Sequence, residues 1–138
     1  MDKKVKNIIT AVVTIAIFIF VGLMLISSFR GPEISIIESE NLLDIDALFY
    51  SKEIEINETV NISLVSPKEI LRKTNGAAIG DVKSGYFTIE GDLPVYLNLG
   101  DATADWIEII DGEDYYYINL KTEIDTIDLY NNLIDMLD

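Results

Sequence analysis

Apolar and polar residues alternate in several short segments of this chain. In the segment LDIDALF, residues 43–49, apolar side chains fall on one face and Asp44 and Asp46 on the other. Alternation with a period of two is typical of a half-buried β-strand. The same pattern recurs at residues 53–57, 60–65, 86–90, 94–100, 106–110 and 115–120, and a further short strand is expected at 33–37. The sequence therefore predicts about seven short strands joined by turns such as Asp111-Gly112, a strong hairpin dipeptide.

The period changes near the C-terminus, where residues 121–138 follow a helical repeat. Thr122 and Asp125 have the spacing of a helix-capping box. A stripe of apolar residues is expected to face the core, formed by Ile124, Ile127, Tyr130, Ile134 and Leu137 and widened by Leu129, Leu133 and Met136. We therefore expect an amphipathic helix over Thr122–Leu137 that closes one end of the sheet.

The first thirty residues have a different character from the rest. Residues 8–27 contain no charge, and about 20 apolar residues rising about 1.5 Å each match the roughly 30 Å hydrocarbon core of a bilayer. We predict an uncleaved membrane anchor within residues 1–30, followed by one domain at residues 31–138. A cleavable signal peptide is the alternative, although its apolar region is usually shorter and ends at a small-residue site.

Lys3, Lys4 and Lys6 precede the apolar run, whereas Arg30 alone follows it closely. Because positive residues stay in the cytoplasm, this bias predicts a single-pass protein of the cell membrane. The N-terminus is expected to be cytoplasmic and the C-terminal domain extracytoplasmic.

The predicted domain is strongly acidic. Residues 31–138 contain six basic and 23 acidic residues, so the domain has a net charge of −17, within a chain whose net charge is −14. Such a surface repels phosphate groups. Nucleic acid and anionic lipid headgroups are therefore not expected as partners, and the membrane is contacted through residues 8–27.

Residues 66–133 carry a set of motifs with a recognisable order. Arg72 and Gly76 lie in a polar segment, Gly85-Tyr86-Phe87 opens a strand, and Asp111-Gly112 and Tyr117 form a hairpin. The closing helix carries the sequence TIDLYNNL, residues 126–133. These features resemble the small bacterial pleckstrin-homology-like domain family found on membrane-anchored proteins. The resemblance implies an α+β, mainly β fold, a pleckstrin-homology-like antiparallel barrel or sandwich with a C-terminal helix.

The glycines of TNGAAIGDVKSG, residues 74–85, invite comparison with a phosphate-binding loop. A P-loop has the pattern GxxxxGK[ST] and opens a helix. Here Asp81 and Val82 separate Gly80 from Lys83, and a strand pattern follows Gly85. We therefore expect these glycines to permit turns and close backbone approaches, and we expect no nucleotide cofactor.

Enzymatic chemistry has few candidate residues in this chain. Without histidine or cysteine, Ser-His and Cys-His nucleophiles and ordinary zinc sites are absent. Carboxylate pairs such as Asp44 and Asp46 alternate with core positions and are interpreted as solvent-facing. The acidic stretches at 101–105 and 111–114 do not match a calcium loop. The prediction is a protein that is not an enzyme, with no catalytic residue, no metal site and no cofactor.

Aromatic residues offer the most specific candidate surface. If Phe87, Leu97, Ile107 and Ile118 face the core, the strand alternation turns a second set outward: Tyr86, Tyr96, Trp106, Tyr115 and Tyr117. Tyrosine and tryptophan are enriched at interface cores. We therefore predict a protein-interaction or assembly module, with a protein partner or self-association. The alternatives are that these rings are covered within the fold, or that the barrel holds a lipid or peptide.

Overall fold

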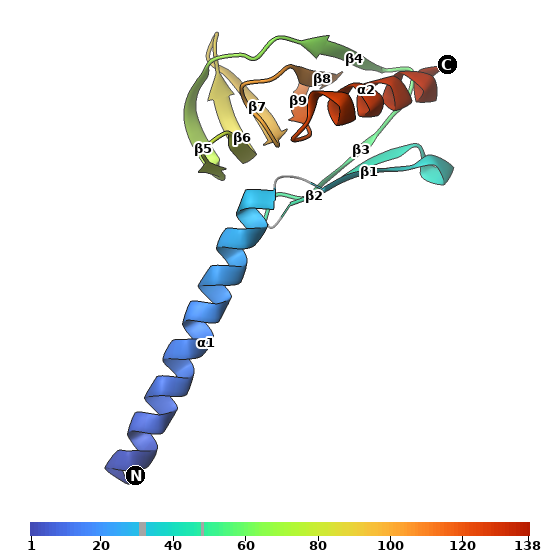
Figure 1. The fold of residues 1–138 in the computed structure, drawn as a ribbon. Coiled ribbons are helices and arrows are strands. Elements are labelled where there is room, and N and C mark those ends of the chain that lie inside the picture. Colours follow the sequence, from blue (N-terminus) through green and yellow to red (C-terminus); the bar gives the residue numbers. More distant parts are fainter. Residues whose placement is uncertain (31–32, 48) are drawn as a thin grey trace.

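The structure is a computed structural model that describes residues 1–30, 33–47 and 49–138 (Figure 1). Two helices flank a set of strands, as the mainly β, α+β prediction requires. The elements in chain order are α1 (Lys3–Arg30), β1 (Glu33–Ile37), a 3-10 turn η1 (Glu38–Glu40), β2 (Leu42–Asp46), β3 (Lys52–Glu55), β4 (Val60–Val65), β5 (Ile70–Ile79), β6 (Val82–Ile89), β7 (Leu93–Leu99), β8 (Trp106–Asp111), β9 (Asp114–Asn119) and α2 (Glu123–Leu137). The part after α1, residues 33–138, is called the β-rich domain below.

Helix α1 extends away from the β-rich domain, and its C-terminal end contacts β5 (Figure 1). Its segment Lys3–Ser27 is long and apolar enough to cross a membrane once, and none of it is buried inside the protein. The predicted long apolar helix is therefore confirmed. A signal sequence near the N-terminus would have the same length and apolar composition.

The first three strands form a small antiparallel sheet in the order β1-β2-β3. Leu43 and Ile45 of β2 and Ile54 of β3 are buried, as their alternation predicted. The strand predicted at 43–49 is too long, because β2 ends at Asp46. The chain turns back there, and Phe49, predicted to face the core, is largely exposed.

The other six strands form a second sheet in the order β4-β8-β9-β7-β6-β5. Neighbouring strands are antiparallel, apart from the parallel pair β7 and β9. The sheet curls strongly but does not close, because β4 and β5 remain its two edges (Figure 1). The closed form of the predicted barrel is therefore not present, and the two stacked sheets correspond to the sandwich form.

The longest strand, β5, was not predicted. Its residues are mostly exposed and do not alternate, so the segment lacks the pattern of a half-buried strand. Its pairing with β6 also shifts register twice, between Ile70 and Arg72 and between Lys73 and Asn75. Such bulges and basic side chains are common devices that protect an edge strand from unwanted pairing.

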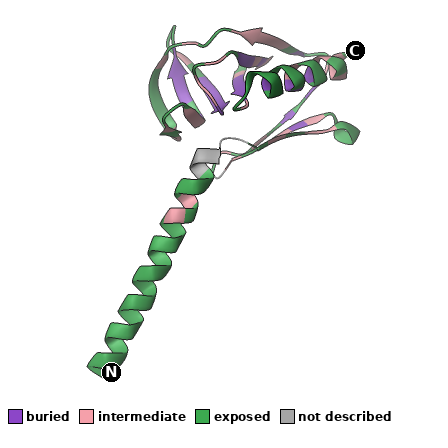
Figure 2. Ribbon diagram, viewed as in Figure 1, coloured by how far each residue is buried: buried purple, intermediate pink, exposed green. Residues whose placement is uncertain are grey.

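Many residues of the central strands of the six-stranded sheet are buried (Figure 2), and their side chains form two separate clusters. One face packs against the three-stranded sheet and α2, through a cluster that includes Ile107, Ile109, Ile118, Leu43, Ile54 and Leu133. The other face curls around a second cluster: Phe87, Ile89, Val95, Leu97, Leu99, Trp106 and Tyr117. Consequently every residue from Val95 to Leu99 in β7 is buried, whichever face its side chain occupies.

Helix α2 begins as the sequence predicts. Its N-cap is Thr122, whose hydroxyl oxygen accepts a hydrogen bond of 3.2 Å from the backbone N–H of Asp125. The buried residues are Thr126, Leu129 and Leu133, so the side facing the sheet is rotated from the predicted stripe. Ile124 and Ile127, both predicted to face the core, are exposed.

Candidate interaction surface

The five aromatic residues predicted to form an outward surface occupy three different environments. Tyr86 is exposed at 42 %, and Tyr115 is half-buried. Tyr96, Trp106 and Tyr117 are buried, so the prediction that these three side chains face outward is wrong. Tyr86 is the member whose ring is open to a partner, and its role in an interaction stays a prediction.

The error has a simple physical cause. The prediction assumed that the sheet has one buried face and one solvated face, as antiparallel sheets commonly do. In the structure, Phe87 and Leu97 belong to one buried cluster and Ile107 and Ile118 to the other. Trp106, which alternates with Ile107 along β8, therefore points into the cluster of Phe87 and Leu97.

Three tyrosine rings surround the ammonium group of Lys52, a residue that the sequence did not single out. Two of them, Tyr86 and Tyr96, belong to the predicted aromatic set, and the third is Tyr116. The Nζ atom lies 5.8, 5.9 and 5.7 Å from the ring centroids of Tyr86, Tyr96 and Tyr116. It also donates a hydrogen bond of 3.3 Å to the Tyr86 hydroxyl. These distances are in the range of cation–π attraction. Lys52 on β3 thereby joins the three-stranded sheet to β6, β7 and β9 of the larger sheet.

Burial, hydrogen bonding and nearby charges shift the pKa values of the residues in this cluster. Burial alone would lower the pKa of Lys52, but the hydrogen bond to Tyr86 and the nearby carboxylate of Asp114 raise it, and the net change is upward. Lys52 is therefore cationic at neutral pH. Burial raises the pKa of Tyr96 to about 12, and it also raises the pKa of Tyr116.

Tyr96 connects the cluster to a neighbouring turn. Its hydroxyl group donates a hydrogen bond to the backbone carbonyl of Tyr50, and it accepts one of 3.0 Å from the side-chain amide of Asn98. The Tyr50 hydroxyl in turn donates to Asn75 Oδ1 at 3.2 Å. The tyrosines thus hold the turn before β3 against β5 and β7, which is a structural role.

The glycines of the 74–85 segment serve the backbone. Gly80 adopts φ +56° in the turn between β5 and β6. Gly76 and Gly85 are cross-strand partners, and a Cβ on Gly85 would lie 2.6 Å from the Asn75 carbonyl oxygen and 2.7 Å from the Gly76 Cα. Lys83 donates a hydrogen bond of 2.5 Å to the Gly80 carbonyl oxygen. The segment is therefore a close-packed β-hairpin, and its glycines are required by backbone geometry.

The acidic loop at 101–105 is held by its own hydrogen bonds. The Asp101 carboxylate accepts from the backbone N–H and the hydroxyl of Thr103, at 3.0 and 2.6 Å. The buried amide of Asn119 donates to the backbone oxygens of Asp101 and Asp105, at 2.6 and 3.1 Å. In the part of the chain that the structure describes, no three His, Cys, Asp or Glu side chains gather as metal ligands do.

Several large apolar residues lie on the surface of the β-rich domain. The exposed members are Phe49, Leu71, Tyr86, Ile124 and Ile127. Phe49 lies beyond the end of a strand that was predicted too long, and Leu71 lies on β5, which was not predicted. The two isoleucines lie on the rotated face of α2. Helical periodicity predicts that both isoleucines face the core, and the packing of α2 leaves them exposed instead.

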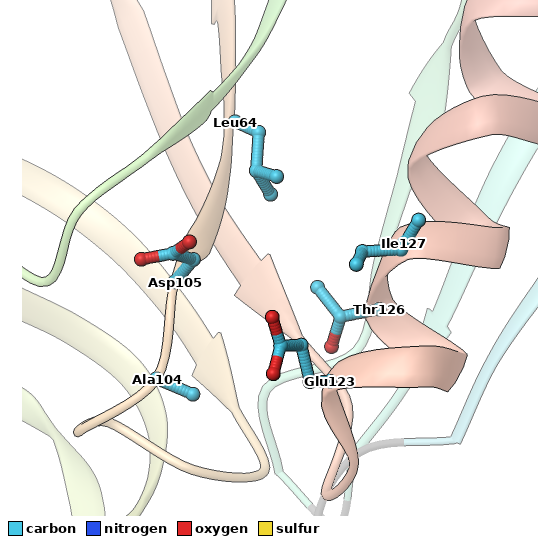
Figure 3. Close-up of a pocket in the computed structure, with 6 residues that line it drawn as sticks. All are labelled: Leu64, Ala104, Asp105, Glu123, Thr126 and Ile127. Atoms are coloured by element: carbon cyan, nitrogen blue, oxygen red, sulfur yellow. The ribbon is translucent and has the colours of Figure 1, made fainter.

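Ile127 also lines a shallow hollow beside α2 (Figure 3). The hollow is shallow and open to solvent, with room for about one water molecule. Its lining residues are Leu64, Ala104, Asp105, Glu123, Thr126 and Ile127. Leu64 and Ile127 lie on different sides of it, and Asp105 and Glu123 are its acidic lining residues (Figure 3). We call this feature the acid-rimmed hollow.

Comparison with family models, with curated proteins and with solved structures finds no match to this chain.

Proposed function

We propose that this chain is a non-enzymatic membrane protein whose β-rich domain acts as a protein-interaction or assembly module at the membrane surface. In this proposal α1 is an uncleaved, single-pass anchor. The N-terminal lysines lie in the cytoplasm and residues 33–138 lie on the outer side. The support for this orientation is the position of Lys3, Lys4 and Lys6 before the apolar segment.

The observation that carries the proposal is the filled interior of the curled sheet. A barrel that holds a small ligand keeps a chamber of a few hundred Å3 inside. Here the concave face is occupied by the side chains of Phe87, Leu97, Trp106 and Tyr117, all buried against one another. Apolar side chains are available on the outside of the domain instead, which favours contact with another protein over the lipid- or peptide-binding alternative.

Kinship with the membrane-anchored pleckstrin-homology-like family is part of the same proposal. It is supported by the mainly β architecture with a capped C-terminal helix that packs on the sheet. The open sheet and the parallel pair β7 and β9 differ from a closed antiparallel barrel. Phosphoinositide binding is not included, because the domain has a net charge of −17.

Crosslinking in intact membranes, followed by mass spectrometry, tests the proposed function. A photoreactive residue placed at Tyr86 or Ile124, both exposed, is expected to capture a protein neighbour. The same residue placed at the exposed acidic position Glu58 serves as the background control. Equal capture from all three positions, or none from any, would refute an interaction role for these surfaces.

Protease treatment of whole cells tests the orientation separately. If residues 33–138 lie outside, external protease should cleave the domain without lysis. Cleavage only after lysis would place the domain in the cytoplasm.

A further inference from the structure

The acid-rimmed hollow is a shallow apolar surface with two acidic residues, which suits contact with an apolar side chain flanked by cations. Its apolar lining residues are Leu64, Ala104 and Ile127, and its charged lining residues are Asp105 and Glu123 (Figure 3). No lysine or arginine is among its lining residues in the described part of the chain. An occupant that brings apolar area and positive charge would remove exposed hydrophobic surface and pair both carboxylates.

The apolar surface continues beyond the hollow along α2. Ile124 is exposed at 73 % and Ile127 at 38 %. Both residues follow Glu123 within the first helical turns, so the exposed apolar surface and the negative charge occur together on one element. Covering exposed apolar surface with a partner favours binding by about 25 cal/mol for each Å2 removed from water.

The same chain carries a segment of matching chemistry on β5. Leu71, exposed at 44 %, is followed directly by Arg72 and Lys73. Strands β5 and β6 contain three basic residues, including Lys83, and no carboxylate, within a domain whose net charge is −17. They are thus basic elements in an otherwise acidic domain.

Among the described residues, the cations of β5 have no strong partner that would compete with a docked carboxylate. Arg72 is 3.9 Å from Asp92, and the two side chains are 63 % and 83 % exposed. An exposed pair at this distance contributes little, about 0–1 kcal/mol. Arg72 can therefore exchange this contact for one with another carboxylate.

Leu71 and the hollow do not meet within one molecule. Strands β4 and β5 are opposite edges of the six-stranded sheet, and the hollow includes Leu64 of β4 but no described residue of β5. Since β5 is fixed by its pairing with β6, the two features can engage only between two copies.

We propose that the β-rich domain self-associates head to tail, with the Leu71-Arg72-Lys73 segment of one copy docked on the acid-rimmed hollow of the next. This inference rests on the proposed function and names its partner as a second copy of this chain. Because each copy uses one surface for one neighbour and a different surface for the next, the contact either closes into a ring or extends into an open chain.

Anchoring and screening make such a contact feasible between two acidic domains. Tethering to one membrane raises the effective concentration of the copies relative to each other. Repulsion between the net charges is screened beyond a Debye length of about 8 Å at physiological salt. The local pairing of Arg72 and Lys73 with Asp105 and Glu123 is then the electrostatic term that decides the geometry.

Cysteine crosslinking tests the geometry directly, because the chain contains no cysteine of its own. Full-length L71C and I127C variants are reconstituted in neutral phosphatidylcholine vesicles, separately and mixed, and treated with a short bismaleimide. A crosslinked dimer is expected from the mixture and not from either variant alone. Dimers within L71C alone, or no dimer in the mixture, would overturn the head-to-tail contact.

Charge reversal tests the electrostatic part of the proposal. One reversal is R72E/K73E on β5, carried by the L71C chain, and the other is D105K/E123K at the hollow, carried by the I127C chain. Either reversal alone is expected to reduce the yield of the crosslinked dimer between L71C and I127C chains about tenfold. Combining the two reversed chains should restore the product. The matched control is E53K/E55K on exposed positions of β3, which changes the net charge as D105K/E123K does and should leave the product unchanged.

The outcomes separate this inference from the proposed function. If photocrosslinking captures a different protein but L71C and I127C form no mixed product, the domain is an interaction module and the self-association is wrong. If the reversed pair fails to recover while circular dichroism shows both variants folded, charge complementarity at this contact is refuted.

Discussion

The rings of Trp106 and Tyr117 meet edge to face, with centroids 5.5 Å apart and planes inclined at 67°. Both side chains are buried on the concave face of the six-stranded sheet. The Trp106 indole N–H donates to the Ala102 carbonyl at 3.1 Å, and the Tyr117 hydroxyl donates to the Glu108 carboxylate at 2.7 Å. Each aromatic body is therefore packed and each polar atom is hydrogen bonded, as buried Trp and Tyr require.

Replacing Trp106 with alanine should destabilise the fold substantially. Removal of a fully buried large aromatic side chain costs about 3–5 kcal/mol, because the remaining cavity cannot close completely. Y86A removes a ring at an exposed position together with its contacts to Lys52 and Tyr96, and should cost only about 1–2 kcal/mol. Urea unfolding of the full chain in detergent, followed by circular dichroism, measures both. Similar losses for the two variants would contradict the assignment of Trp106 to the core.

Adding a methyl group at Gly85 should also weaken the fold. Gly85 has φ +114°, and the new Cβ would lie 2.6 Å from a backbone oxygen, so the β5–β6 pairing must shift. We expect G85A to lower the free energy of unfolding by about 2–4 kcal/mol. The matched variant G80A adds a methyl group at φ +56° in open space and should cost only about 1 kcal/mol. Equal costs would show that the close approach at Gly85 is not restrictive.

The ammonium group of Lys52 should stabilise the contact between the two sheets. K52M removes the charge and the hydrogen bond to Tyr86, and the expected loss is about 1–2 kcal/mol. K73M removes the same charge from an exposed position on β5 and should cost less than about 0.5 kcal/mol. The same unfolding measurement checks both variants, and a K52M protein as stable as the parent would refute the role of the cluster.

Stability should decline at alkaline pH. The pKa of Tyr96 is about 12 in the folded protein and 10.0 ordinarily, chiefly because of burial. A raised folded-state pKa means that the native state holds its proton more tightly than the unfolded state. The resulting stabilisation is complete below about pH 10, is lost as the pH rises to about 12, and amounts to the order of 2 kcal/mol.

Unfolding curves between pH 8 and 12 measure this decline. The raised pKa values of Tyr116, Tyr117 and Lys52 act in the same direction. Y96F loses the hydrogen bond to the Tyr50 carbonyl, so it should be less stable than the parent at neutral pH. It also lacks the titrating hydroxyl group of Tyr96. Its stability should nevertheless fall less steeply above pH 10. An unchanged slope would contradict the contribution of Tyr96.

Local patterns in the sequence were sufficient for several elements. The capping spacing of Thr122 and Asp125 located the start of α2, and the uncharged run of residues 8–27 located α1. Alternation identified most strands, because their buried side chains repeat every second residue. Strand β5 was missed because an exposed edge strand with two bulges has no such repeat.

The sequence by itself determined which residues are apolar, where the helical and strand periods change, and how acidic the β-rich domain is. Only the tertiary structure decided which apolar residues are covered. Trp106 and Tyr117 are buried because the sheet curls around them, whereas Ile124 and Ile127 are exposed because α2 packs through Leu129 and Leu133. Periodicity fixes a face relative to its own element, but coverage depends on a second element that is distant in the sequence.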